Sequence, residues 1–147
     1  MSTIMKFERL QDKQCESVIS FLLSEKIHFS LFCLIDRVKF MPELPREIME
    51  NFQPISLFVL KGYTFDSIEL TARGIIFEAG FGSENIGRYV EIGFRDILQV
   101  IITNPKDKDV PVFTRLSCRD LFDFTQEDEL QKSMEAIMSN PHNKQYL

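Results

Sequence analysis

The chain has 147 residues, of which 44% are hydrophobic and 27% charged, and a chain of this length can form one domain with a substantial core. Its net charge of −5 argues against a general affinity for nucleic acid, since nucleic-acid-binding proteins usually carry a basic excess. No apolar run reaches the ~20 residues of a membrane-spanning helix, and residues 1–10 lack the apolar segment of a secretory signal, so we expect a cytoplasmic protein without membrane contact.

The first predicted element is a helix to about Lys26 with Asp12 as its N-cap, and it follows an N-terminal stretch expected to be irregular. Apolar residues recur along it at helical spacing, namely Cys15, Val18, Ile19 and Leu22. Phe21 and Leu23 widen this stripe beyond one face. The wider stripe is either a broad core face or a core face beside a partner contact.

Strands are predicted after the helix. Residues 28–40 form one extended segment with apolar side chains on both faces, which predicts cover on both sides. Prolines end this segment, one or two helical turns are expected within residues 46–52, and a second strand spans Ile55–Leu60.

The fold is expected to centre on residues 65–103, FDSIELTARGIIFEAGFGSENIGRYVEIGFRDILQVIIT, which predict a β-meander. Apolar and polar residues alternate on either side of a turn at residues 82–85. Val110–Leu116 is predicted to be an edge strand because it contains Pro111. Residues 117–147 carry six acidic and three basic residues and are predicted to be partly helical from Thr125. We therefore expect a core domain of residues 1–116 and an acidic extension of residues 117–147.

The sequence contains no catalytic or metal-binding constellation. Cys15, Cys33 and Cys118 are widely spaced, which predicts reduced thiols rather than a metal or redox pair. The two histidines, His28 and His142, suggest no nucleophile–base pair, and the glycines match no phosphate-binding loop. We therefore expect a protein that is not an enzyme and needs no cofactor and no metal.

The order of these elements resembles the stringent starvation protein B family, the adaptors that deliver ssrA-tagged proteins to the ClpXP protease. The similarity runs from about Asp12 to Leu116, through SVISFLL (17–23), HFSLFCLIDRV (28–38) and ILQVI (97–101). It is most specific at IIFEAGFGS (75–83), where the family usually has an apolar or aromatic residue followed by Ala-Arg-Phe-Gly-Gly. Gly80 and Ser83 stand where the family has Arg and Gly, and Gly93 replaces a common proline.

The resemblance implies an α+β protein, mainly β, in which an N-terminal helix precedes a small Sm-like antiparallel β-barrel or sandwich. It implies a homodimer formed largely through the helix, with Val18, Phe21 and Leu22 at the interface. It also implies a groove for ssrA-type tag peptides and a second partner, the ClpX unfoldase. The matching groove positions, with Arg88 a candidate partner for tag carboxylates, are Phe77, Ala79, Phe81, Gly82, Arg88, Val90 and Ile92. The alternative for the large apolar members of this set is that they fill the core.

Two other functions stay open. An Sm-like barrel can bind single-stranded RNA by stacking bases on exposed aromatic side chains, or it can take another peptide or protein partner. A small-molecule-binding barrel or weak enzyme would use Glu78, Glu91 or His28, and it would require a pocket that displaces their pKa values.

Overall fold

The computed structural model describes residues 1–122, 134, 135 and 137. The chain divides into two compact units, Glu8–Leu116 and a second unit of Met1–Phe7 with Ser117–Leu147. In the second unit, the short helix α4 (Cys118–Phe122) places the ring of Phe122 edge-on to Phe7, 5.2 Å between centroids. The helix predicted from Thr125 lies outside the described residues except for positions 134, 135 and 137, which are helical.

Helix α1 (Thr3–Ser24) begins nine residues before the predicted cap at Asp12. Ser2 caps it, because its hydroxyl oxygen accepts a hydrogen bond from the Met5 N–H (3.2 Å) and its carbonyl oxygen accepts one from the Lys6 N–H (3.1 Å). The expected irregular N-terminus and the expected cap at Asp12 are therefore wrong. The predicted stripe holds, since Cys15, Ile19 and Leu22 are buried and Val18 is half-buried.

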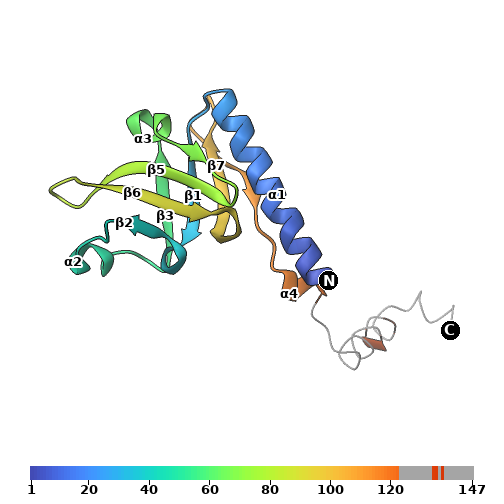
Figure 1. Ribbon diagram of the computed structural model, residues 1–147. Helices are drawn as coiled ribbons and strands as arrows, with labels where there is room; N and C mark the ends of the chain where they lie inside the picture. The colour runs from blue at the N-terminus through green and yellow to red at the C-terminus, as the bar shows by residue number, and fades with distance from the viewer. Residues whose placement is uncertain (123–133, 136, 138–147) are drawn as a thin grey trace. The chain divides into compact units, whose positions relative to one another are not determined.

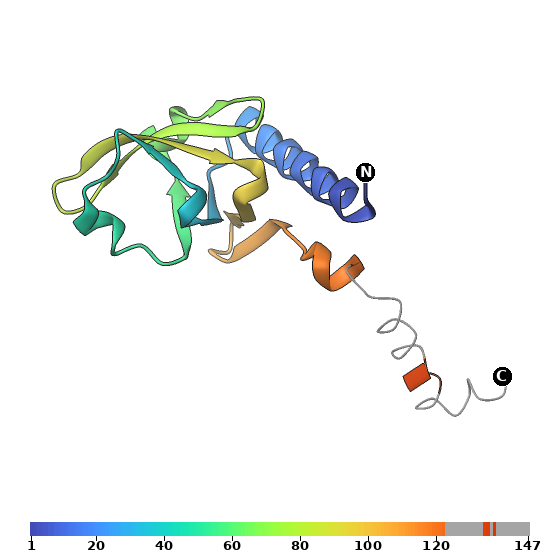
Figure 2. The same ribbon diagram turned by 60° about the horizontal axis from the view of Figure 1, so that its bottom comes forward.

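In the described part of the chain, the strands form two antiparallel sheets of four strands each, shown from two directions in Figures 1 and 2. Sheet A has the order β3 (Ile55–Leu60), β1 (Phe29–Leu34), β7 (Ile97–Thr103), β8 (Asp109–Thr114). Sheet B has the order β2 (Lys39–Met41), β6 (Ile86–Gly93), β5 (Gly74–Phe81), β4 (Glu69–Leu70). The predicted α+β class, with a helix before antiparallel β-structure, is confirmed, although helix and strand content are roughly equal.

The chain passes between the two sheets at short 3-10 helices. η1 (Ile35–Arg37) links β1 to β2, and η2 (Phe94–Asp96) links β6 to β7. The prediction of one continuous strand over residues 28–40 is wrong, and so is the expected cover on both faces. Phe29, Leu31 and Cys33 are buried, but Leu34 on the opposite face is 37% exposed.

Two further short helices lie in the connections, and β8 lies at a sheet edge. α2 (Arg46–Met49) fits the expected helical turns, and α3 (Gly62–Asp66) follows β3. β3 has the predicted bounds, and β8 is an edge strand that contains Pro111, as expected.

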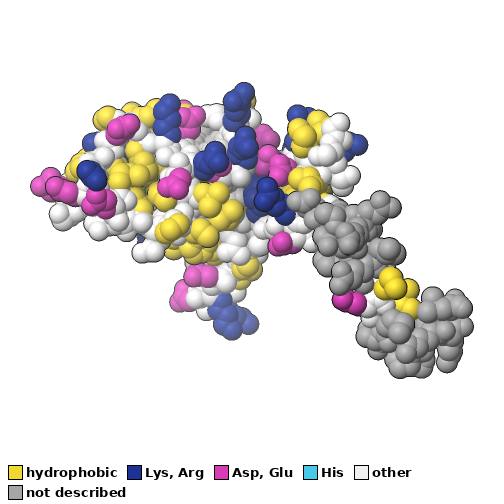
Figure 3. All heavy atoms as spheres, turned by 90° about the horizontal axis from the view of Figure 1, so that it is seen from below, with side chains coloured by type: hydrophobic (Ala, Val, Ile, Leu, Met, Phe, Trp, Pro, Cys, Tyr) yellow, Lys and Arg dark blue, Asp and Glu magenta, His cyan; other side chains and the backbone are white. Residues whose placement is uncertain are grey.

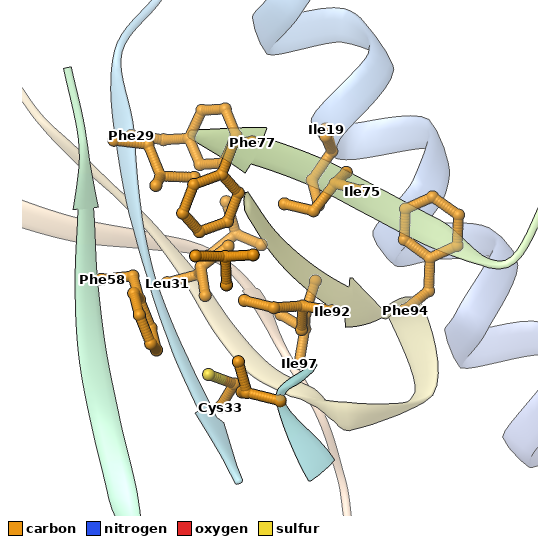
Figure 4. Close-up of a cluster of buried hydrophobic side chains, with 14 of the residues drawn as sticks. Ile19, Phe29, Leu31, Cys33, Phe58, Ile75, Phe77, Ile92, Phe94 and Ile97 are labelled. Atoms are coloured by element: carbon orange, nitrogen blue, oxygen red, sulfur yellow. The ribbon is translucent and has the colours of Figure 1, made fainter. Parts of the chain in front are cut away.

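The core lies between the sheets and against α1 (Figure 4). Sheet B contributes Ile75, Phe77 and Ile92, which point toward Leu31 and Cys33 of sheet A in the close-up. Among the described residues of this tryptophan-free chain, phenylalanines supply the aromatic side chains of the core.

Arg115, just beyond β8, connects the helix to the sheets. Its Nη1 lies 3.0 Å from Oδ1 of Asp12 on α1. Its Nε and Nη2 donate to the carbonyl oxygens of Ile97 (2.9 Å) and Phe94 (2.8 Å). The neighbouring residue, Leu116, exchanges two hydrogen bonds with the Gln11 side chain. Asp12 therefore serves in a tertiary ion pair instead of a helix cap.

Candidate peptide-binding groove

Three of the predicted peptide-binding residues are core residues. Phe77 is 1% exposed, and Val90 and Ile92 are fully buried between the sheets. Figure 4 shows Phe77 and Ile92 pointing into the cluster of apolar side chains. A fully buried side chain has no surface to offer a peptide, so the assignment of these three residues to a groove is corrected to the core alternative.

Phe81 and Gly82 have structural tasks at the end of the β5–β6 hairpin. Phe81 is half-buried, and its ring lies edge-on to Phe40 at 5.3 Å between centroids and close to Phe52 and Phe58. Gly82 has φ +74° in the turn, a conformation that side chains rarely adopt. These two residues shape the hairpin end, where Phe81 keeps part of its surface exposed and Gly82 is exposed.

The other two predicted residues, Ala79 and Arg88, line an open groove of about 560 Å³ beside the hairpin. The cross-strand register places Glu78 opposite Tyr89 and Gly80 opposite Gly87. Strand β2 borders β6 here, with Met41 opposite Tyr89. The complete lining is Met41, Pro42, Tyr63, Thr64, Glu78, Ala79, Gly80, Asn85, Gly87, Arg88 and Tyr89.

Two glycines, Gly80 and Gly87, line this groove. A Cβ atom on Gly80 would collide with the carboxamide of Asn85, which folds over this position from the turn. A Cβ atom on Gly87 would meet nothing within 4 Å. A residue with a side chain at position 80 would therefore have to displace Asn85, whereas a Cβ atom at position 87 would enter open space.

A carboxylate lies between two exposed tyrosines in the groove. Tyr63 is 70% exposed and Tyr89 53%. The Tyr63 hydroxyl donates a hydrogen bond to Glu78, and a second hydrogen bond links Glu78 to Tyr89. Hydrogen bonds from Tyr63 and then Tyr89 lower the pKa of Glu78, and the same bonds raise the pKa of each tyrosine. The groove thus presents two aromatic faces joined by an ionised acceptor.

Arg88 also lines the groove, but strand alternation sets its side chain on the face of β6 opposite to that of Tyr89. Its Nη1 donates to the carbonyl oxygen of Gly87 (2.8 Å), and its Nε and Nη2 reach that of Glu43 (3.4 and 3.3 Å). Within the described part of the chain, Arg88 has no carboxylate partner. Its guanidinium is therefore held in place by backbone carbonyls and keeps its charge available for an anionic ligand.

The predicted dimer residues also differ in how far they are buried. Leu22 is buried in the core and Val18 is half-buried, whereas Phe21 is 58% exposed. The wide apolar stripe therefore combines core residues with a residue that is free for a partner contact. Leu22 and Val18 face the core, and Phe21 is the one member of the three with most of its surface free.

Residues with catalytic potential show little sign of activation. Burial raises the pKa of the Cys15 and Cys33 thiols to about 12, so both stay protonated near neutral pH. The His28 ring packs against Phe65, 4.6 Å between centroids. Among the described residues, no three His, Cys, Asp or Glu side chains form a group suited to a metal ion, and no helix is long and apolar enough to cross a membrane.

The groove would have been hard to find from the sequence. Tyr63 comes from α3 and Met41 from β2, and only the tertiary structure brings them beside Glu78 and Tyr89. The available signal was the alternation along β5 and β6, which places Glu78 and Tyr89 on the outer face. No family model matches the chain, and no curated protein sequence matches it.

Proposed function

We propose that this protein is a non-enzymatic adaptor that binds ssrA-type degradation tags and delivers tagged proteins to the ClpXP protease. The observation that carries the peptide-binding half is the groove beside the β5–β6 hairpin, which joins apolar, aromatic and charged groups in one open channel. The delivery half rests on the resemblance to the stringent starvation protein B family.

The groove suits an extended, partly acidic peptide. Ala79, Met41 and Pro42 offer small apolar contacts, and the exposed rings of Tyr63 and Tyr89 offer flat surfaces for side chains. Arg88 pairs with a peptide carboxylate by charge-assisted hydrogen bonds. Apolar contacts supply affinity in such a complex, whereas the fixed charge selects the register of the bound peptide.

Fluorescence anisotropy tests the proposal, with a labelled ssrA-type peptide and a scrambled peptide of the same composition. We expect saturable binding of the tag only. Gly87→Val adds a side chain to the groove at a position where its Cβ has no atom within 4 Å, and we expect it to weaken binding about tenfold or more, equivalent to ~1.4 kcal/mol. The control is Thr114→Val on β8, which lies outside the groove. Absence of tag binding by the folded wild type, or equal binding by Gly87→Val, contradicts the proposal.

The alternative of single-stranded RNA binding has one observation in its favour. Tyr63 and Tyr89 expose neighbouring aromatic surfaces, and bases stack on such surfaces. The ionised Glu78 between them and the net charge of −5 oppose a phosphate backbone. A gel shift with a single-stranded RNA at low salt decides this point, because electrostatic binding is strongest there; no shift removes the alternative.

A further inference from the structure

Strand β3 presents an uncovered apolar edge. Apolar side chains reach the protein surface in patches between charged groups (Figure 3). Along β3 they do so at alternate positions, with Ile55, Leu57 and Val59 about half exposed (51%, 48% and 50%). Among the strands that the structure describes, β3 is the outermost of sheet A and pairs with β1 alone. One long side of the strand therefore has no neighbouring strand within the described part of the chain.

The backbone of the same three residues faces the free edge. The β1–β3 register ends with Leu34 opposite Ile55, and its continuation sets Ile35 opposite Pro54. The Ile35 N–H donates to the Pro54 carbonyl oxygen (3.0 Å), so this pair is a hydrogen-bonded one. Since hydrogen-bonded and non-bonded pairs alternate in an antiparallel ladder, Ser56, Phe58 and Leu60 bond to β1. Ile55, Leu57 and Val59 therefore direct their N–H and C=O groups outward.

The edge lacks the features that usually prevent strand pairing. Edge strands of monomeric proteins are commonly protected by lysines, prolines, bulges or short length. The six residues of β3, ISLFVL, contain no charge and no proline, and their pairing with β1 is regular throughout. The other edge of sheet A differs, because β8 contains Pro111 and pairs with β7 through a register shift.

We propose that β3 is the homodimer interface and pairs antiparallel with β3 of a second copy about a two-fold axis at Leu57. Leu57 then lies opposite Leu57 of the second copy, and Ile55 lies opposite Val59 of the second copy. In this register the outward backbone groups of all three residues are hydrogen-bonded, and the two sheets A join into one continuous sheet.

Charge placement favours a second copy as the occupant. A two-fold axis sets each residue near its own counterpart at the centre, where a charged side chain would be repelled. The centre of β3 is uncharged, and the nearest charged residue, Lys61, lies opposite Gln53 of the second copy in this register. The two Lys61 side chains are thus at opposite ends of the paired strands.

The predicted interface on α1 is less suited to this task. From Glu8 onward, the large apolar residues that α1 exposes are Leu10 and Phe21, separated by three helical turns. The β3 edge instead combines three half-exposed apolar side chains with backbone groups that point away from β1. The dimer expected from the sequence is therefore assigned to β3, and this assignment does not depend on the peptide groove.

Light scattering after size-exclusion chromatography tests the interface. We expect the wild type to have twice the mass of one chain. Leu57→Lys sets two like charges opposite each other and is expected to halve that mass, whereas Thr114→Lys on the other edge and Phe21→Ala leave it unchanged. A monomeric wild type, a dimeric Leu57→Lys variant, or loss of the dimer in either control variant overturns the proposal.

A cysteine pair keeps the test decisive if Leu57→Lys fails to fold. Opposed residues of a hydrogen-bonded pair have Cα atoms ~5.5 Å apart, within disulfide range. Leu57→Cys is therefore expected to form a covalent dimer on mild oxidation. The matched Val59→Cys variant is not expected to form this crosslink. Position 59 lies opposite position 55 of the second copy, so the two cysteines are four residues, about 13 Å, apart along the strand. Equal crosslinking of the two variants, or none in Leu57→Cys, overturns the register.

Discussion

Replacing Arg115 by alanine should cost far more stability than replacing an exposed arginine. The Arg115 side chain is 13% exposed and that of Asp12 is 35% exposed, with 3.0 Å between Nη1 and Oδ1. Arg115→Ala removes this ion pair and two charged donors to the carbonyl oxygens of Ile97 and Phe94. These contacts hold α1 against the sheets, so their loss should lower the free energy of unfolding of the whole Glu8–Leu116 unit.

The magnitude follows from the burial of each contact. Each hydrogen bond from the guanidinium contributes ~1.5 kcal/mol, the lower end for a charged donor. The ion pair adds ~1 kcal/mol, since the Asp12 carboxylate is one-third exposed and water screens it. We therefore expect a loss of about 4 kcal/mol, a large part of the ~5–15 kcal/mol that stabilises a typical domain. Arg115→Lys should recover only a part, because lysine lacks the planar fork that reaches three acceptors.

Urea unfolding followed by far-ultraviolet circular dichroism measures this loss in a chain without tryptophan. The matched control is Arg46→Ala, which removes the Arg46–Glu50 pair at 2.9 Å, with side chains 91% and 63% exposed. Such an exposed pair on one helix contributes at most ~0.5 kcal/mol. A cost below ~1 kcal/mol for Arg115→Ala, or equal costs for the two variants, would refute the reasoning that burial decides the value of these arginines.

Two further predictions concern the aromatic cluster and the buried thiols. Phe81→Ala removes the ring contacts with Phe40, Phe52 and Phe58. We expect the free energy of unfolding in urea to fall by about 2–3 kcal/mol, less than for a fully buried ring because Phe81 is only half-buried. A loss under ~1 kcal/mol would contradict this. Cys15 and Cys33 should resist a thiol reagent at pH 8 until urea unfolds the chain, as measured by peptide mass spectrometry, and rapid native labelling would exclude their burial. Their folded pKa of about 12 lies above the ordinary value of 9.0, so their contribution to stability is complete below pH 9 and is lost as pH rises toward 12. Cys33→Ala should reduce the fall in the free energy of unfolding between pH 9 and pH 12. An unchanged dependence on pH would contradict the contribution of this thiol.

Local patterns predicted most of the secondary structure. The bounds of β3 and the hairpin of β5 and β6 follow from alternation and from the Gly82 turn, which are properties of neighbours along the chain. The same reasoning failed at residues 28–40, because alternation cannot show that η1 carries the chain from one sheet to the other. It also failed at Asp12, where a tertiary partner 103 positions away, Arg115, decides the role of the carboxylate.

The sequence by itself determined the fold class, since a helical stripe followed by alternating strands can bury its apolar residues only as a helix against antiparallel sheets. Only the tertiary structure decided which apolar residues are free. Phe77 and Leu57 both alternate along strands, yet Phe77 is in the core and Leu57 is at an open edge. The groove likewise depends on segments that meet across the sheets. Whether a side chain is buried depends on the neighbours that folding brings into contact with it, and the spacing of residues along the chain does not determine those neighbours.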